Sequence, residues 1–575
     1  MKMHIYHHSL IFLVALTLSC SSRQTADLIL LNGKILTVDR DFTIAEAVAV
    51  SGDKIIGVGT VTDISGYSGR KTKTIDLRGK TVIPGIIDAH MNFQMAALSE
   101  LGQDIPDAGS IPVLLDWIEE QTRVKDEGEW IVLPRFFATR LIELRQPHLS
   151  ELDKAAPFHP VFLNGTFGGM INTAAMRLSE ITGKTGHPGI TTDENTGMPT
   201  GFIKASAFEL LDLPPEKELS YHDKLQAFAE MMNRYNRFGI TSLFAGSGSY
   251  EDYHLYRDMA ERKMLTTRIT QNINFRPDGE ITKESLTEKL RSFNDVSGHG
   301  DEWVRIGSLK AFLDGGILTG TAYLGEPWGE KAAEFFGFED PLYRGIVNYT
   351  HEELVMIVDA ALDKGWTFSA HSTGGGGVEL LLDVFEEVSR LHPVNEKRLS
   401  IIYGNFYRKS AIERMKNLGI YANMQPAWFY KDADAMTDIL GKERVLDFHP
   451  YRSLIDAGVV VNGGSDHMVK WDANRSINPY NPFIGMWTAI TRTTERGTII
   501  NLPEAITREE ALRMYTINNA KASFEESCKG SIEPGKLADM VILSDDFLSC
   551  PADNIREIES VMTIVGGKIV YESGF

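Results

Sequence analysis

Short apolar runs that alternate with helical stretches constrain the fold of this chain more than any other feature. The runs have the length and composition of buried strands, and stretches such as 223–237 and 352–364 separate them with helical periodicity. Repeated strand–helix units predict a parallel sheet, and their number favours closure into a (β/α)8 TIM-like barrel, with an open doubly wound sheet as the alternative. The candidate strands are 130–133, 160–163, 240–244, 268–271, 304–310, 366–369, 399–402, 420–423 and 459–461.

Both ends of the chain carry a different pattern, in which short apolar segments follow one another with turn residues between them. Asn32-Gly33 and Gly566-Gly567 are typical of hairpin turns. Short sheets from opposite ends of a chain can pair only if the ends meet, so we expect one small composite β-sandwich. The predicted domains are a first sandwich part over 20–81, the barrel over 82–530 and a second sandwich part over 531–575.

The composition is that of a large acidic chain. Its 575 residues are 43% hydrophobic and include 58 Lys and Arg against 78 Asp and Glu, which gives a formal net charge of −20. Nucleic acids and anionic membrane surfaces require clustered Lys and Arg, so this balance argues against both as the main partner. We expect a small-molecule substrate. The sequence leaves the oligomeric state open, a homodimer included.

The first residues have the pattern of a bacterial export signal. Lys2 precedes the apolar run 10–16, which is too short to cross a membrane, and small residues stand directly before Cys20. The pattern predicts a signal peptide over 1–19 and lipidation of Cys20, so that a lipid anchors the protein in the bacterial cell envelope. A periplasmic or secreted protein without the lipid is the alternative. Cys528 and Cys550 alone are too few for a disulfide framework.

Polar groups first appear where the apolar segment 82–92 ends. His90 and Asn92 are two residues apart, so on a strand both side chains point to the same face. In a parallel barrel the active site lies at the carboxyl ends of the strands. The segment therefore predicts that His90 and Asn92 lie side by side at the mouth of the barrel.

The segment 84–92 resembles the first-strand signature of the amidohydrolase superfamily, and 533–539 resembles part of the composite β-sandwich of the same proteins. The family carries His-X-His on this strand for a catalytic divalent metal, and this chain has Asn92 in place of the second histidine. Asn is a poor ligand for zinc. The order of motifs is similar to that of the branch of N-substituted formamide deformylases.

Two further strand ends bear on how many metal-binding histidines the chain has. His371 lies at the end of the short apolar segment 368–372 and resembles a second metal-binding histidine of the family, whereas the segment 399–405 has no histidine where relatives have one. Two of the four usual histidine ligands are thus replaced. The resemblance implies a reduced site of His90, His371 and Asp466 for one divalent ion such as zinc, and the sequence leaves open whether any metal binds.

Asp466 follows the apolar run 459–461 and a Gly-Gly turn. Gly-Ser-Asp at a strand end is the family's signature for the aspartate that takes a proton from the attacking water. The resemblance therefore implies that Asp466 is the general base. The alternative interpretation is an aspartate that caps the next helix together with Ser465.

Lys310 ends another candidate strand, and Asp314 follows it in the same loop. In N-substituted formamide deformylases a similar Lys-X-X-X-Asp-Gly segment lies at the active site, where the lysine of a two-metal centre is carbamylated. A desolvated lysine that stays an amine can act as a base or a nucleophile, and an exposed loop lysine is the alternative. Gln425, which resembles a residue of the same branch, is a candidate for substrate binding together with Asn92 and Asp314. The aromatic run 428–430 that follows favours packing.

These residues lead to three hypotheses. The first is an exported enzyme that hydrolyses an amide or related C–N bond of a small molecule, with Asp466, His371 and Lys310 as catalytic residues. The second is metal-independent acid–base chemistry on the same fold, as in an isomerase, a lyase or a C–C hydrolase. The third is a catalytically inactive barrel that binds a ligand. Since a fold does not determine a function, the arrangement of the strand-end residues has to discriminate among them.

Overall fold

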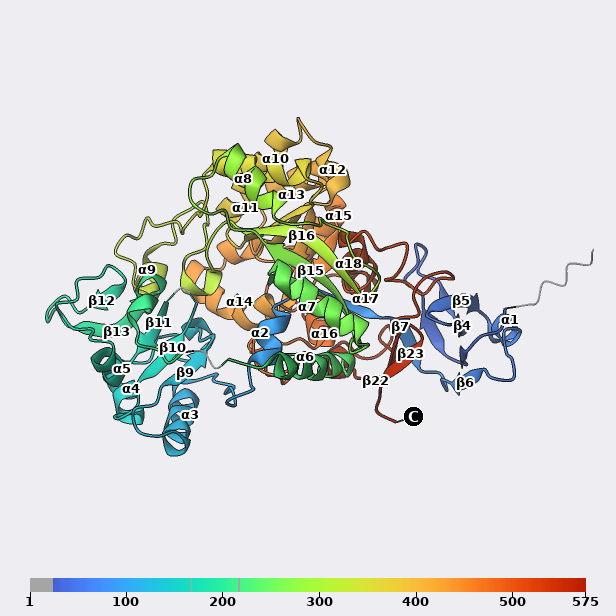
Figure 1. Cartoon of the computed structure of the whole chain (residues 1–575), viewed down its shortest axis with the longest axis horizontal. Helices are drawn as coiled ribbons and strands as arrows, with labels where there is room; N and C mark the ends of the chain where they lie inside the picture. The colour runs from blue at the N-terminus through green and yellow to red at the C-terminus, as the bar shows by residue number, and fades with distance from the viewer. Residues whose placement is uncertain (1–23, 167, 216–217, 575) are drawn as a thin grey trace, which may run out of the picture.

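The structure of the protein is a computed structural model that describes residues 24–166, 168–215 and 218–574 (Figure 1). A central barrel carries a small β-sandwich on one side and an inserted sheet on the other. The predicted signal peptide 1–19 and Cys20 lie outside the described residues. Cys528 and Cys550 are free thiols. Within the described part of the chain, no helix has both the length and the apolar character needed to cross a bilayer.

The barrel has eight parallel strands in the order β20-β19-β18-β17-β16-β15-β14-β8. Its two edge strands meet where the amide of Asp466 donates a hydrogen bond of 2.7 Å to the carbonyl of His90. The predicted (β/α)8 barrel is therefore confirmed. The strands are β8 (Ile86–Met91), β14 (Ile240–Gly248), β15 (Arg268–Asn274), β16 (Val304–Phe312), β17 (Phe368–Ser372), β18 (Ser400–Tyr403), β19 (Tyr421–Met424) and β20 (Val461–Gly463).

Helices surround the barrel and connect its strands (Figure 1). The predicted helical stretches 223–237 and 352–364 correspond to α6 and α10. The helices of the barrel and its loops are α2 (Phe93–Leu98), α6 (Tyr221–Asn236), α7 (Tyr250–Glu261), α8 (Lys283–Arg291), α9 (Glu330–Phe336), α10 (His351–Asp363), α11 (Gly375–Val388), α12 (Val394–Lys397), α13 (Lys409–Leu418), α14 (Pro426–Leu440), α15 (Tyr451–Ala457), α16 (Pro482–Thr491), α17 (Arg508–Met514) and α18 (Ile517–Ala522).

The strands β8 and β17 are buried along their whole length. In a parallel barrel, one face of each strand lines the interior and the helices cover the other, so both faces are removed from water. The sequences Ile86–Met91 and Phe368–Ser372 are accordingly dominated by apolar and small residues. The histidines that they carry are buried polar groups, which need partners at the mouth of the barrel.

Both ends of the chain form the small sandwich. The four-stranded sheet has the order β5-β4-β1-β6, and the six-stranded sheet has the order β23-β22-β21-β7-β2-β3. Gly566-Gly567 joins the antiparallel strands β22 and β23 as expected, but β1 pairs with β4 and β6, so Asn32-Gly33 is not a hairpin turn. The elements are β1 (Leu28–Leu31), β2 (Lys34–Leu36), β3 (Ile44–Ala45), β4 (Ala47–Ser51), β5 (Lys54–Gly59), α1 (Val61–Ser65), β6 (Lys73–Asp76), β7 (Thr81–Pro84), β21 (Met540–Leu543), β22 (Ser560–Val565) and β23 (Lys568–Glu572).

A separate five-stranded sheet is inserted between β8 and β14, in the order β12-β13-β11-β10-β9. The assignment of 130–133 and 160–163 to the barrel was wrong, because these runs form β9 and β10 of the insertion. They are parallel neighbours, as barrel strands would be, so the local pattern does not distinguish the two sheets. The elements are α3 (Ile111–Val124), β9 (Ile131–Pro134), α4 (Leu149–Ala155), β10 (Val161–Asn164), β11 (Gly168–Ile171), α5 (Thr173–Leu178), β12 (Ile190–Thr192) and β13 (Pro199–Lys204).

Candidate active site

Polar side chains from several barrel strands converge at the carboxyl ends of those strands. His90 comes from β8, Lys310 from β16, His371 from β17 and Tyr403 from the end of β18, and Asp466 follows β20. All five residues are buried. The site is therefore a closed polar cluster at the mouth of the barrel.

Asp466 is the most heavily hydrogen-bonded group of the cluster. Its Oδ1 accepts hydrogen bonds from Nδ2 of Asn92 (2.8 Å) and the hydroxyl of Tyr403 (3.3 Å). Its Oδ2 accepts from Nε1 of Trp428 (3.1 Å) and Nδ2 of Asn478 (3.3 Å). Burial raises the pKa of Asp466 to about 6, against the lowering effect of the Lys310 charge and of the hydrogen bonds from Trp428 and Tyr403. The carboxylate is therefore ionised at neutral pH and can accept a proton.

The turn before Asp466 packs tightly against β8. The carboxylate of Asp88 accepts hydrogen bonds from the amides of His90 (3.0 Å) and Ser465 (3.0 Å). A Cβ at Gly464 would lie 2.6 Å from the amide nitrogen of His90, so this close approach requires glycine. Burial raises the pKa of Asp88 to about 7. The Gly-Gly turn thus fixes Asp466 relative to His90. The four donors to the Asp466 carboxylate described above are all side chains, so the carboxylate does not act as a helix cap.

Tyr403 occupies the centre of the cluster. Its hydroxyl oxygen lies 3.2 Å from Nε2 of His90 and 3.3 Å from Oδ1 of Asp466. Its ring packs edge-on against the rings of His90 and His371, at centroid distances of 5.4 and 4.8 Å. Burial, followed by the charge of Asp466, raises the pKa of Tyr403 well above its ordinary value. The phenol therefore stays protonated and is a hydrogen-bond donor.

Lys310 points into the same cluster. Its Nζ lies 3.4 Å from Nε2 of His90 and faces the rings of Phe312 and Tyr403, at 4.8 and 5.7 Å. Burial lowers the pKa of Lys310 to about 7, and the charge of Asp466 opposes this effect. The alternative of an exposed loop lysine is therefore wrong. Burial and the Lys310 charge also lower the pKa of His90 well below its ordinary value, so the imidazole is neutral.

His371 and Asp314 belong to the adjoining loop. Nε2 of His371 lies 3.0 Å from the carbonyl of Gly315 and 3.6 Å from Oδ1 of Asp314, and its Nδ1 has no partner among the described residues. Burial lowers the pKa of His371 to about 3. Asp314 accepts hydrogen bonds from the amides of Thr373 (2.9 Å) and Gly374 (2.8 Å), so its carboxylate holds the loop in place.

The other sequence candidates differ in how they contribute. Asn92 contacts Asp466, as described above, whereas Nε2 of Gln425 donates to the side chain of Asn423 (2.8 Å). Sequence reasoning missed Tyr403 and Asn478 and assigned Trp428 to packing. A polar-tipped aromatic at a strand end was the available signal for Tyr403. Asn478 reaches Asp466 from a loop, and no sequence pattern marks it.

The cluster fits one metal ion better than two. Nε2 of His90 and Oδ1 of Asp466 lie 3.6 Å apart, a spacing that suits two ligands of one ion with bonds of about 2.0–2.2 Å. The unpartnered Nδ1 of His371 is a third donor, but the described residues of the mouth do not bring three such ligand atoms within 4.8 Å of one another. Phenol oxygens are not usual zinc ligands, so Tyr403 does not replace the absent histidine chemically.

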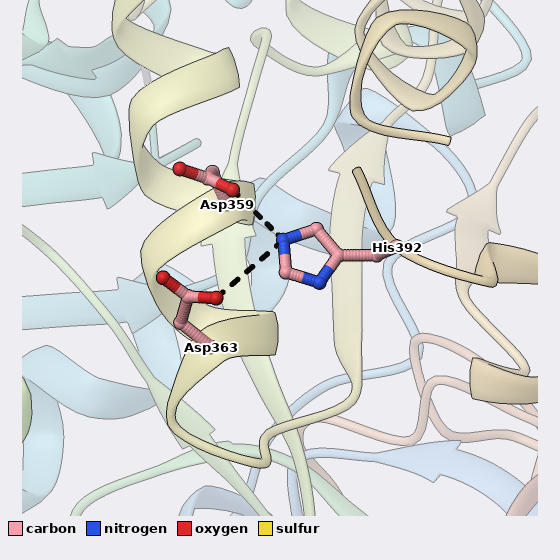
Figure 2. A group of neighbouring side chains, drawn as sticks. All are labelled: Asp359, Asp363 and His392. Atoms are coloured by element: carbon pink, nitrogen blue, oxygen red, sulfur yellow. Dashed lines mark hydrogen bonds and ion pairs between the residues drawn. The ribbon is translucent and has the colours of Figure 1, made fainter. Parts of the chain in front are cut away.

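A second group of potential ligands lies in the outer helical layer (Figure 2). Asp359, Asp363 and His392 are the described residues that do bring three ligand atoms within 4.8 Å of one another. Nε2 of His392 lies 2.8 Å from Asp359 and 3.7 Å from Asp363. One ring nitrogen of His392 faces both carboxylates, and the three residues come from α10 and from the loop after α11 rather than from the barrel mouth.

A cavity of about 660 Å³ lies between the inserted sheet and the loop that follows β16. The insertion contributes Phe136, Phe137 and Phe202 to its wall, and the loop contributes Leu318, Phe336 and Tyr343. Its volume is that of a pocket for a small organic ligand, which such cavities bind mainly through apolar walls. The loop that lines it also supplies the carbonyl of Gly315 next to His371.

Comparisons with known proteins agree with this architecture. The chain is 29% identical to N-substituted formamide deformylase of Arthrobacter pascens over 96% of this chain and 99% of that protein. It is 27% identical to the protein LONG AFTER FAR-RED 3 of Arabidopsis thaliana, over 95% and 92% of the two chains. The fold is similar to that of a metal-dependent hydrolase from Pyrococcus horikoshii, with a TM-score of 0.67, 22% identity and coverage of 92% and 99%. The sequence profile of the amidohydrolase family matches residues 73–571, so the chain belongs to the amidohydrolase family.

Proposed function

We propose that the protein hydrolyses an amide or related C–N bond of a small molecule. The observation that carries the proposal is the carboxylate of Asp466, which is buried at the barrel mouth and held by four hydrogen-bond donors. The likeness to a formamide deformylase supports this bond type. The loop after β16, which brings the carbonyl of Gly315 next to His371, also lines the cavity of about 660 Å³, whose volume would suit an organic substituent of the substrate.

In this proposal Asp466 is the general base. Its carboxylate removes a proton from a water molecule, whose oxygen bonds to the carbonyl carbon of the substrate. The same carboxyl group then gives the proton to the departing nitrogen, so that the carboxylate is restored. The neutral imidazoles of His90 and His371 border the reacting atoms, and Asn92 keeps Oδ1 of Asp466 oriented.

A divalent ion such as zinc is the proposed cofactor, and His90 and Asp466 would hold it, with Nδ1 of His371 as the third donor. When bound, such an ion lowers the pKa of a coordinated water and polarises a carbonyl group. Two imidazoles and one carboxylate form a smaller ligand set than the family's usual four histidines. We therefore expect at most one ion per chain.

The test combines elemental analysis with an activity screen. Protein purified without chelator is assayed for bound metal and for hydrolysis of a panel of N-substituted formamides and other amides. We expect up to one ion per chain in the wild type and less in His90→Ala and His371→Ala. Asp466→Asn is expected to reduce kcat by about 10²–10⁴-fold. Asp553→Asn, which changes an exposed aspartate, is the control.

Lys310 favours a second candidate, metal-independent acid–base chemistry. Its buried amine with a pKa of about 7 lies against His90, so it can exchange protons near neutral pH. A wild type that is active without bound metal would favour this candidate over a metal-assisted hydrolase. A wild type that turns over no compound in a broad screen would favour a ligand-binding barrel over both.

We also propose that the protein is exported and anchored through a lipid on Cys20, with the periplasm or the medium as the alternative location. The support is the sequence pattern of residues 1–20, which lie outside the described part of the structure. Removal of 1–19 would leave a chain that begins at Cys20. Substitution Cys20→Ala should move the protein from the membrane fraction to the soluble fraction. An unchanged distribution would contradict lipidation.

A further inference from the structure

We propose that Tyr403 is a catalytic residue whose hydroxyl donates a hydrogen bond to the carbonyl oxygen of the substrate while the C–N bond is hydrolysed. This inference rests on the proposed function. Tyr403 stands at the strand end where the family's histidine is absent, and its hydroxyl lies 3.2 Å from His90 and 3.3 Å from Asp466. No other phenol contacts Asp466 among the hydrogen bonds of the described residues.

The backbone of Tyr403 is held in a costly conformation. Its φ is +76°, in the left-handed region that bulky residues rarely adopt. Such conformations persist only where the surrounding structure determines them, and they cluster at functional sites. Tyr403 is the last residue of β18, and its ring packs against His90 and His371 of the cluster.

The Asp466 carboxylate, which accepts the hydrogen bond of the Tyr403 hydroxyl, does not depend on that bond. Asp466 keeps three other donors, Asn92, Trp428 and Asn478, when the Tyr403 hydroxyl redirects its proton. The carboxylate would therefore remain solvated by the protein when a substrate oxygen takes the hydrogen bond of Tyr403. A carboxylate whose only donor was Tyr403 would be left buried without a hydrogen bond, which costs free energy.

The ring of Tyr403 is fixed, so that only the hydroxyl can reorient. The rings of His90, His371 and Trp428 pack edge-on against it at centroid distances of 5.4, 4.8 and 5.9 Å. Rotation about the C–O bond is enough to redirect the proton. A donor that is positioned before the reaction stabilises developing charge more effectively than one that must first be ordered.

The chemical step is balanced with water as the only co-reactant. Asp466 removes a proton from water, the water oxygen bonds to the carbonyl carbon, and the π electron pair moves onto the carbonyl oxygen. The Tyr403 hydroxyl donates its hydrogen bond to that oxygen and keeps its proton. The electron pair then returns, the C–N bond breaks, and the nitrogen takes the proton from Asp466.

The substitution Tyr403→Phe tests the proposal, because it removes one oxygen and keeps the ring. We expect kcat to fall by about 10²–10³-fold, as for the loss of one oxyanion donor, while KM changes little. Bound metal per chain should not change. Inhibition by an N-alkyl phosphonamidate, a tetrahedral mimic of the hydrolysed amide, should weaken by the factor by which kcat/KM falls. Tyr403→His keeps an N–H donor and should retain more activity than Tyr403→Phe.

Tyr407→Phe is the matched control, since the Tyr407 hydroxyl is buried and has no hydrogen-bond partner among the described residues. It should leave kcat, KM and metal content unchanged. A Tyr403→Phe enzyme with wild-type kcat would overturn the role of Tyr403 but not the proposed function. A loss of metal in that variant would also overturn this role, because it would make Tyr403 a metal ligand. A wild type inactive on every amide would overturn the proposed function and this inference together.

Discussion

The amine of Lys310 lies 3.4 Å from Nε2 of His90, so two basic groups share one buried site. Neither can be protonated without cost, because burial lowers the pKa of both. Asp466 is the negative charge that favours a proton on Lys310. The protonation state of the cluster is therefore divided between Lys310 and Asp466, which have pKa values of about 7 and about 6.

Stability should depend on pH through Lys310. Because its pKa falls from 10.5 to about 7 on folding, the unfolded chain binds a proton between these values that the folded chain lacks. The free energy of unfolding therefore rises with pH in that window. In the wild type we expect the free energy of unfolding to rise by about 2–3 kcal/mol between pH 7.5 and 9.5, since one proton corresponds to about 1.4 kcal/mol per pH unit. Lys310→Met should abolish this rise. Urea unfolding at several pH values measures this rise. Lys409→Met, at an exposed position, should retain it, and an identical slope in both variants would contradict the assignment.

The sequence predicts the parts of the site that are local to a strand end. His90, His371 and Asp466 each follow an apolar run, and the barrel brings their strand ends together. Asn478 reaches Asp466 from a loop, and Trp428 reaches it from the start of α14. The orientation of these two side chains depends on tertiary packing, which no local sequence pattern predicts.

The inserted sheet is the part of the fold that the local sequence pattern does not predict. The runs 130–133 and 160–163 have the composition of barrel strands, but they pair with each other in the inserted sheet. Local apolar character determines that a segment is a strand and not which sheet it joins. The replacement of a histidine at the end of β18 was visible only as an absence, whereas the structure shows that the hydroxyl of Tyr403 lies between His90 and Asp466.

Trp428 should control the acidity of Asp466. Its indole N–H donates a hydrogen bond of 3.1 Å to Oδ2 and lowers the pKa of that carboxyl group. In Trp428→Phe the pKa of Asp466 should rise further above about 6, so that the rise of kcat/KM with pH occurs at higher pH, by about one unit for a hydrogen bond to a charged group. The pH profile of kcat/KM measures the shift. Trp487→Phe removes a buried indole N–H that has no partner among the described residues, and its profile should match the wild type.

Gly464 should not tolerate a side chain. A Cβ there would lie 2.6 Å from the amide nitrogen of His90 and 2.9 Å from Oδ1 of Asp88, and a backbone atom cannot move away easily. Gly464→Ala should destabilise the protein by about 1–3 kcal/mol, as overpacking does, and reduce activity because Asp466 is displaced. Chemical unfolding and kcat measure the two effects. Gly102→Ala, where a Cβ would meet nothing within 4 Å, is the control and should be neutral.

Restoring the family's first-strand histidine should not restore its metal centre. In Asn92→His the second imidazole is placed beside His90, but the hydrogen bond of 2.8 Å from Asn92 to Asp466 is lost. Tyr403 still occupies the strand end that a second ion would need, and its ring packs against both His90 and His371. We expect no more than one metal ion per chain and no gain in kcat in Asn92→His. The double variant Asn92→His/Tyr403→His, which supplies both absent imidazoles, should bind more metal than either single variant. Elemental analysis of the three proteins after loading with zinc measures the difference. Two ions in Asn92→His alone would show that Tyr403 does not limit the site to one.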